Sequence, residues 1–159
     1  MESYQGKNDF IALCYDNDDR AAAERIAEAL NALRIRVWSN YRGCVLRKSS
    51  DAERFAGCRT VFVLISAKWL KGKNNTDHLK GAVLMDKQTV LLFLDDTDLS
   101  ANEETAALLN RSMRMIDCDP ENLDECMQEL LSMECVTDCI MAEDEEPDTK
   151  TTSLLDIFS

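Results

Sequence analysis

The segment Thr60-Val61-Phe62-Val63-Leu64-Ile65 indicates the fold class of this chain most clearly. After its first residue the run is entirely apolar, and it is rich in β-branched side chains, which favour extended backbone. An unbroken apolar run of this length is typical of a strand that is buried on both faces. Such strands lie at the centre of parallel sheets, so we predict a central parallel strand over residues 60–65.

Shorter apolar runs lie on either side of this stretch along the chain. Further strands are predicted over residues 10–15, 35–38, 89–94 and 114–117. Segments with apolar residues at helical spacing separate them, most clearly from Arg20 to Leu33. Alternating strands and helices predict an α/β, three-layer fold with a five-stranded parallel sheet and helices on both faces. The expected strand order is 2-1-3-4-5, as in flavodoxin-like folds.

Charge divides the chain into two parts. The net charge is −12, and residues 134–159 hold eight acidic residues against one basic residue. We predict a folded domain over residues 1–135 and an acidic tail without fixed structure over residues 136–159. The tail ends with the large apolar residues Leu154, Leu155, Ile157 and Phe158. These residues form a docking peptide that folds on binding a partner, or a terminal turn that packs back on its own domain, or a disordered end.

Composition argues against several classes of function. A strongly acidic surface repels phosphate backbones and anionic membranes, so we expect no nucleic-acid and no membrane partner. No apolar run approaches the roughly 20 residues of a membrane span, and the first residues contain no apolar signal segment. The seven cysteines lack zinc-ligand spacing, so we expect no metal and no cofactor, and a reducing, cytoplasmic location with thiols in the core.

Three segments resemble signatures of Toll/interleukin receptor (TIR) domains, in particular the bacterial type. The first is Asp9–Tyr15, an Asp followed by a strand that ends in an aromatic residue. The second is Arg36-Val37-Trp38, and the third is Val63–Ser66 followed by Trp69-Leu70. They occur in the family's order over residues 8–133. The loop after the second strand lacks the family's Pro, and the Phe-Trp near the last helix is absent.

The resemblance raises the question of catalysis. Some TIR domains hydrolyse NAD with a Glu in the helix after the third strand, where a carboxylate stabilises an oxocarbenium-like ribose. In this chain His78 stands at that position, and Asp77 is the nearest carboxylate. A neutral imidazole does not supply the missing charge, and we expect His78 to be a residue on the helix surface. NAD nucleosidase activity through Asp77 is therefore the alternative rather than the first expectation.

The family's other activity is assembly with like domains, through the loop after the second strand. The corresponding residues are Tyr41, Arg42, Gly43, Val45, Leu46 and Arg47. Aromatic, aliphatic and Arg side chains together suit a self-associating surface, whose counterpart would be the acidic turn Asp95–Asp98 of a neighbour. Alternatively, Val45 and Leu46 pack on the following helix. The resemblance thus predicts a non-catalytic TIR-like signalling module that binds itself or other TIR domains.

A cluster of acidic residues follows the first strand. We expect Asp16, Asp18 and Asp19 to cap the helix that begins near Arg20. A phosphorylation receiver also has acids here, but it needs an Asp and a Lys at the positions where this chain has Ser66 and Asp117. The receiver is therefore disfavoured.

Overall fold

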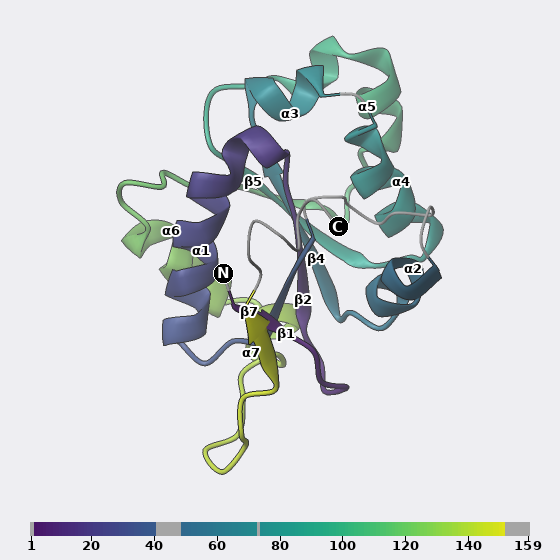
Figure 1. Ribbon diagram of the computed structural model, residues 1–159. Coiled ribbons are helices and arrows are strands. Elements are labelled where there is room, and N and C mark those ends of the chain that lie inside the picture. Colours follow the sequence, from purple (N-terminus) through teal and green to yellow (C-terminus); the bar gives the residue numbers. More distant parts are fainter. Residues whose placement is uncertain (1, 41–48, 73, 152–159) are drawn as a thin grey trace.

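The computed structural model describes residues 2–40, 49–72 and 74–151 (Figure 1). Its main sheet has five parallel strands in the order β3-β2-β4-β5-β6. They are β2 (Ile11–Cys14), β3 (Val37–Asn40), β4 (Thr60–Ile65), β5 (Gln88–Phe93) and β6 (Arg114–Asp117). Counted along the chain within this sheet, the order is 2-1-3-4-5. The predicted α/β fold class is confirmed.

Strand β4 lies at the centre of the sheet, and all six of its residues are buried. Successive side chains of a strand point to opposite faces. Accordingly, Phe62 and Leu64 pack in one apolar core, whereas Val61, Val63 and Ile65 pack in the other. The uninterrupted apolar run in the sequence is thus the consequence of a strand that contributes to both cores.

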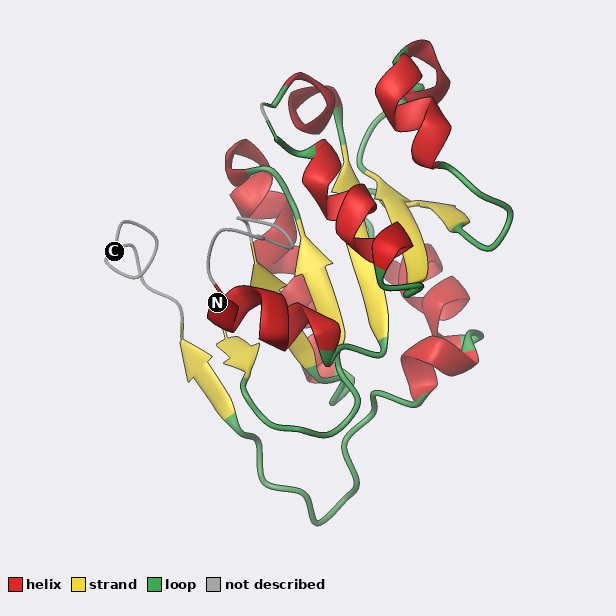
Figure 2. Cartoon of the chain, turned by 90° about the vertical axis from the view of Figure 1, so that its right-hand side faces the viewer, coloured by secondary structure: helices red, strands yellow, loops and turns green. Residues whose placement is uncertain are grey.

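Helices cover both faces of the sheet (Figure 2). One face is covered by α1 (Arg20–Ala32), α6 (Asp124–Leu131) and α7 (Glu134–Thr137). The other is covered by α2 (Ser49–Ala56), α3 (Ala67–Lys71), α4 (Thr76–Leu84) and α5 (Glu103–Leu108). Short 3-10 turns, η1 (Asn17–Asp19) and η2 (Leu99–Ala101), complete the described elements. The six cysteines of the described residues are all buried, as expected for small core side chains.

The C-terminal segment folds back onto the domain, so the predicted boundary after residue 135 is wrong. Val136 and Cys139 are fully buried in the core that α1 also lines. Residues 141–151, called here the C-terminal strap, end in β7 (Thr149–Thr151), which pairs antiparallel with β1 (Glu2–Tyr4). Neither strand was predicted, because runs of three residues are too short to show periodicity.

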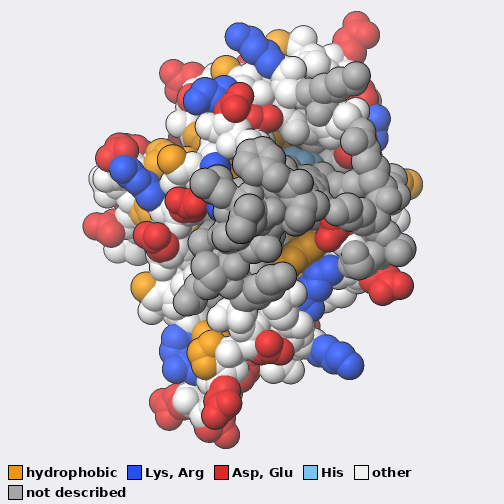
Figure 3. Space-filling view, in the orientation of Figure 1, with side chains coloured by type: hydrophobic (Ala, Val, Ile, Leu, Met, Phe, Trp, Pro, Cys, Tyr) orange, Lys and Arg blue, Asp and Glu red, His pale blue; other side chains and the backbone are white. Residues whose placement is uncertain are grey.

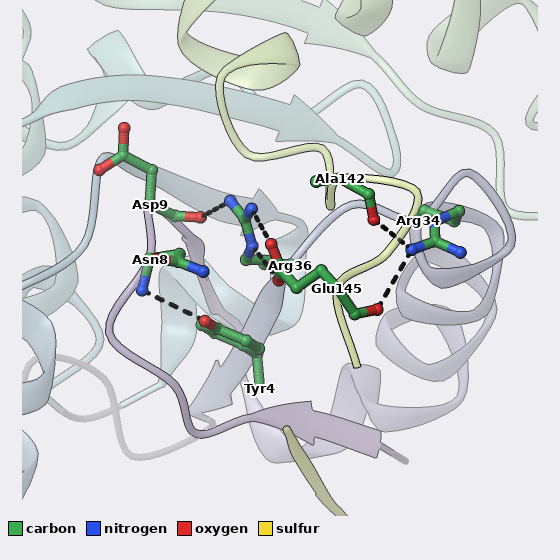
Figure 4. Close-up of polar contacts among 7 residues, drawn as sticks. All are labelled: Tyr4, Asn8, Asp9, Arg34, Arg36, Ala142 and Glu145. Atoms are coloured by element: carbon green, nitrogen blue, oxygen red, sulfur yellow. Dashed lines mark hydrogen bonds and ion pairs between the residues drawn. The ribbon is translucent and has the colours of Figure 1, made fainter. Parts of the chain in front are cut away.

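Arg36 holds the C-terminal strap against the domain (Figure 4). Its Nε donates to Glu145 Oε2 at 2.7 Å and its Nη2 donates to Glu145 Oε1 at 2.6 Å, while Nη1 donates to the Asp9 carbonyl at 2.8 Å. Arg34 Nη2 adds a bond of 2.6 Å to the Ala142 carbonyl. The acidic composition suggested disorder because composition does not show which charges are paired. In the structure Arg36, which is distant in sequence, pairs with Glu145 of the strap.

The remaining acids of the strap face solvent. Glu143, Asp144 and Glu146 are exposed, and Figure 3 shows acidic side chains gathered at the foot of the molecule, where Figure 1 places the turn of the strap. Loop residues 41–48 and the terminal residues 152–159 lie outside the described residues, and with them the predicted interaction loop and the apolar C-terminal residues. No helix in the described ranges is long and apolar enough to cross a bilayer.

Candidate functional site

Polar side chains gather where the strand order reverses, between the carboxyl ends of β2 and β4. In open α/β sheets this point is the usual position of a ligand crevice. Asp16 and Asp19 follow β2, and Ser66 follows β4. With Trp69, Asn75 and His78 from the segment after β4, they form what we call the switch-point cluster.

Ser66 joins the two strand ends of the cluster. Its hydroxyl donates to Asp19 Oδ2 and accepts a hydrogen bond of 3.0 Å from the Trp69 amide, which caps α3. Burial raises the pKa of Asp19, against the opposite effect of the Ser66 hydrogen bond. Asp19 was predicted to cap α1, but its side chain makes no cap hydrogen bond there. Asp16 does act as a cap, accepting from the Asp18 amide of η1.

Asn75 occupies the predicted interruption between α3 and α4. Its Nδ2 donates to Asp16 Oδ2 at 2.9 Å and to the Trp69 carbonyl at 2.8 Å. Gly72 makes this approach possible, because a Cβ at that position would lie 2.0 Å from Asn75 Nδ2. The polar stretch that interrupts the predicted helix therefore has a structural role, because its Asn75 connects α3 to the end of β2 through hydrogen bonds.

His78 is buried, so the prediction of a helix-surface residue is wrong. Only 1% of the residue is exposed, and its Nδ1 accepts a hydrogen bond of 3.1 Å from Trp69 Nε1. Burial lowers the pKa of His78 to about 4, and nearby Asp16 offsets this only in part. The imidazole is therefore neutral at physiological pH and carries its proton on Nε2, because Nδ1 is the acceptor.

Asp77, unlike the adjacent His78, is not part of the switch-point cluster. It is half-buried at the first turn of α4, and within the described residues its carboxylate is not among the groups that the cluster joins. The structure therefore brings His78, but not Asp77, into the cluster. The hydroxyl of Ser66 donates to Asp19, and the hydrogen bond to His78 Nδ1 comes from Trp69 instead.

The switch-point cluster is largely satisfied by its own hydrogen bonds. In the described ranges, no three side chains of His, Cys, Asp or Glu stand close enough together to hold a metal ion. Sequence reasoning identified the individual residues Asp19, Ser66 and His78 but missed their partners. The one local signal was Ser66 at the start of a helix after a buried strand, which is the position of an N-cap.

A second surface lies at the other side of the sheet, beside the edge strand β6. A pocket of about 400 Å³, called here the β5–β6 pocket, opens between the end of β5 and the segment after it. Its apolar residues are Phe93, Leu99, Leu109 and Met115, and its acidic residues are Asp96 and Asp98. An apolar surface beside acids suits a ligand with apolar and basic groups.

Hydrogen bonds favour the ionised form of Asp95 and Asp98 in the Asp95–Asp98 turn. Burial would raise the pKa of Asp95, but hydrogen bonds from Thr97 and from the Ala67 amide outweigh it and lower that pKa. Hydrogen bonds from the Ser100 hydroxyl and amide lower the pKa of Asp98. Both carboxylates are therefore charged at neutral pH, and the turn is a fixed anionic surface.

The fold and the cluster define the class of protein: an α/β domain of flavodoxin-like architecture whose switch-point side chains bond chiefly to one another. No model of a known protein family matches the sequence, and no curated protein matches it either.

Replacing Ser66 by Ala is expected to lower the free energy of unfolding by about 1.5 kcal/mol, because it removes a helix cap and leaves Asp19 without its donor. Urea unfolding followed by circular dichroism measures the change. Ser100→Ala is the matched control, since its hydroxyl also donates to an Asp but is exposed. Equal losses in the two variants would contradict the role assigned to Ser66.

Proposed function

We propose that this chain is a TIR-like signalling module that acts in the cytosol by associating with itself or with like domains. The observation that carries the proposal is the β5–β6 pocket, with its apolar floor and its charged acids. Surfaces that bind other proteins combine an apolar centre with a polar rim, and this pocket is lined by apolar and acidic residues. Three sequence segments resemble those of TIR domains, and this resemblance suggests that the partner is a second copy of the chain or another TIR domain.

The floor of the pocket includes an apolar side chain that folding leaves in water. Met115 lies on the edge strand β6 and is 53% exposed. Methionine adapts its shape to different partners, and it is common at binding surfaces. Leu99 and Leu109 extend the apolar floor, and Asp98 lies beside it. Covering Met115 with a partner would remove apolar area from water and so favour association.

The complementary surface is the loop over residues 41–48, whose structure lies outside the described residues. In its sequence, Tyr41, Val45 and Leu46 are apolar, whereas Arg42 and Arg47 are basic. The loop follows β3, and β3 and β6 are the two opposite edges of the sheet. A donor and an acceptor surface on opposite edges produce a head-to-tail contact, which repeats from one copy to the next.

NAD nucleosidase activity is the second candidate, and no described contact favours it. The residue at the family's Glu position is a buried, neutral His78 bonded to Trp69. A neutral group does not stabilise the positive charge that develops on the ribose as nicotinamide leaves. Asp77 would have to supply that charge from outside the hydrogen-bonded cluster.

Association is tested by sedimentation velocity over a range of protein concentrations and two salt concentrations. Met115→Lys places a charge on the apolar floor, and we expect it to weaken assembly at least about tenfold, a change of about 1.4 kcal/mol. Leu84→Lys is the matched control, because Leu84 is 77% exposed on α4, away from the pocket. Tyr41→Ala and Leu46→Asp test the loop and are expected to act like Met115→Lys.

Three results would count against the proposal. They are a strict monomer at every concentration that also binds no TIR domain, unchanged assembly of Met115→Lys, and an equal loss in Leu84→Lys. The assembled protein is also incubated with NAD. Release of nicotinamide that is lost in Asp77→Ala would establish the second candidate function instead.

A further inference from the structure

We propose that a pocket at the amino ends of the strands binds a small anion whose charged group is a carboxylate or a phosphate. The pocket has a volume of about 370 Å³ and is lined by Lys7, Phe10, Glu53, Arg54 and Gly57. Phe10 precedes β2 and Gly57 follows α2, so the pocket lies at the opposite end of the strands from the switch-point cluster. It has no part in the association proposed above.

Arg54 is the residue that makes this pocket unusual. Its Nη1 donates to the Gly6 carbonyl, its Nη2 donates to the Tyr4 carbonyl at 2.6 Å, and its guanidinium carbon lies 3.9 Å from the centre of the Phe10 ring. Its Nε is buried and has no hydrogen-bond partner among the described residues. The guanidinium is therefore oriented by two carbonyl oxygens and an aromatic ring. None of these groups carries a negative charge that would neutralise it.

No described carboxylate forms an ion pair with Arg54. Asp148 of the C-terminal strap attracts it only through space. Arg54 is partly buried, and burial lowers its pKa, which the attractions of Tyr4 and Asp148 offset only in part. A cation taken out of water without a counter-charge is costly, and an anion in the adjacent pocket would offset that cost.

The other residues of the pocket determine the charge and the size of the anion that it accommodates. Lys7 adds a second positive charge, and both Lys7 and Glu53 are exposed, so Glu53 can turn its carboxylate toward water. Gly57 leaves one wall without a side chain: a Cβ there would lie 3.8 Å from Phe10 Cε1, at ordinary contact distance. The volume exceeds that of a bare phosphate, so the anionic group has room for a small organic body beside it.

The test is a titration of the full chain with two probes, sodium phosphate and benzoate, followed by NMR of the Lys7 and Gly57 amides. We expect saturable shifts with at least one probe, and the better probe identifies the anionic group. Higher ionic strength is expected to weaken the binding, because Lys7 is exposed to salt.

Three variants separate the pocket from general surface charge. Gly57→Leu fills the pocket without changing a charge and is expected to abolish the shifts. Lys7→Gln is expected to weaken binding up to about fivefold, as for an exposed ion pair. Lys71→Gln removes an exposed lysine of α3 and is expected to leave binding unchanged.

Absence of saturable shifts with both probes would overturn the inference, and so would undiminished binding in Gly57→Leu. Lys7→Gln keeps the test valid should Gly57→Leu unfold, because an equal loss in Lys7→Gln and Lys71→Gln would also overturn it. The association experiments above are independent of this result, since neither probe nor variant touches the β5–β6 pocket.

Discussion

Arg36→Ala is expected to lower the free energy of unfolding by about 3 kcal/mol, the lower end of the range for breaking a buried ion pair. The side chains of Arg36 and Glu145 are 8% and 16% exposed, and two hydrogen bonds join them. Removing the guanidinium takes two hydrogen bonds and the counter-charge from the Glu145 carboxylate, which keeps the hydrogen bonds from the Ala142 backbone and the Asn8 side chain. The loss stays near the lower end because the strap carrying Glu145 can move out into water.

Urea unfolding measures this loss, and amide hydrogen exchange shows where it acts. The Gln5 amide, which donates to the Asp148 carbonyl of the strap at 2.7 Å, is expected to lose protection in Arg36→Ala. Arg25→Ala is the control: Arg25 also pairs with a glutamate, Glu121, but the side chains are 51% and 77% exposed. Such a pair is worth about 1 kcal/mol at most. Equal losses in the two variants, or full protection of Gln5, would show that the strap is not held by Arg36.

Lowering the pH from 7 to 5 is expected to reduce the stability of the protein by about 2 kcal/mol through His78 alone. Burial lowers the pKa of this residue from 6.5 to about 4. Between these values the unfolded chain binds a proton that the native protein does not. The contribution of His78 is therefore fully present above pH 6.5, and it is lost as the pH falls toward 4.

His78 is the only histidine of the chain, so its contribution can be isolated. We expect His78→Gln to lose less stability than the natural protein between pH 7 and pH 5, by that same 2 kcal/mol, in urea unfolding. Burial raises the pKa of Asp19, whose titration acts in the opposite direction. This contribution is common to both proteins and cancels in the difference. Identical pH dependence in the two proteins would contradict a buried, neutral His78.

The candidate site was predictable only in part. Its residue types were visible in the sequence, as were Ser66 at a helix start and the acids after the first strand. The bond between Ser66 and Asp19 was not visible, because it joins residues 47 positions apart. His78 was placed on the helix surface by its own polarity, but Trp69 supplies a donor for Nδ1, which lets the neutral ring be buried.

The attachment of the C-terminal strap was likewise not predictable from the sequence, because it depends on contacts between residues far apart along the chain. Its acidic composition is that of a disordered segment, yet Glu145 meets Arg36 across 109 positions of sequence. An ion pair, a three-residue strand and hydrogen bonds to Arg34 and Gln5 attach it to the domain. Neither feature leaves a pattern among neighbouring residues.

The five parallel strands, the helices between them and the central place of residues 60–65 could all be predicted from the order of residues along the chain. The reason is that a buried strand or helix face produces a regular spacing of apolar residues among neighbours along the chain, and this spacing can be recognised in the sequence. The pairs of polar groups that form hydrogen bonds, by contrast, became known from the folded structure: Arg36 with Glu145, Ser66 with Asp19, and Trp69 with His78. A hydrogen bond depends on positions in space within a few tenths of an ångström, and those positions exist only once distant segments have packed together.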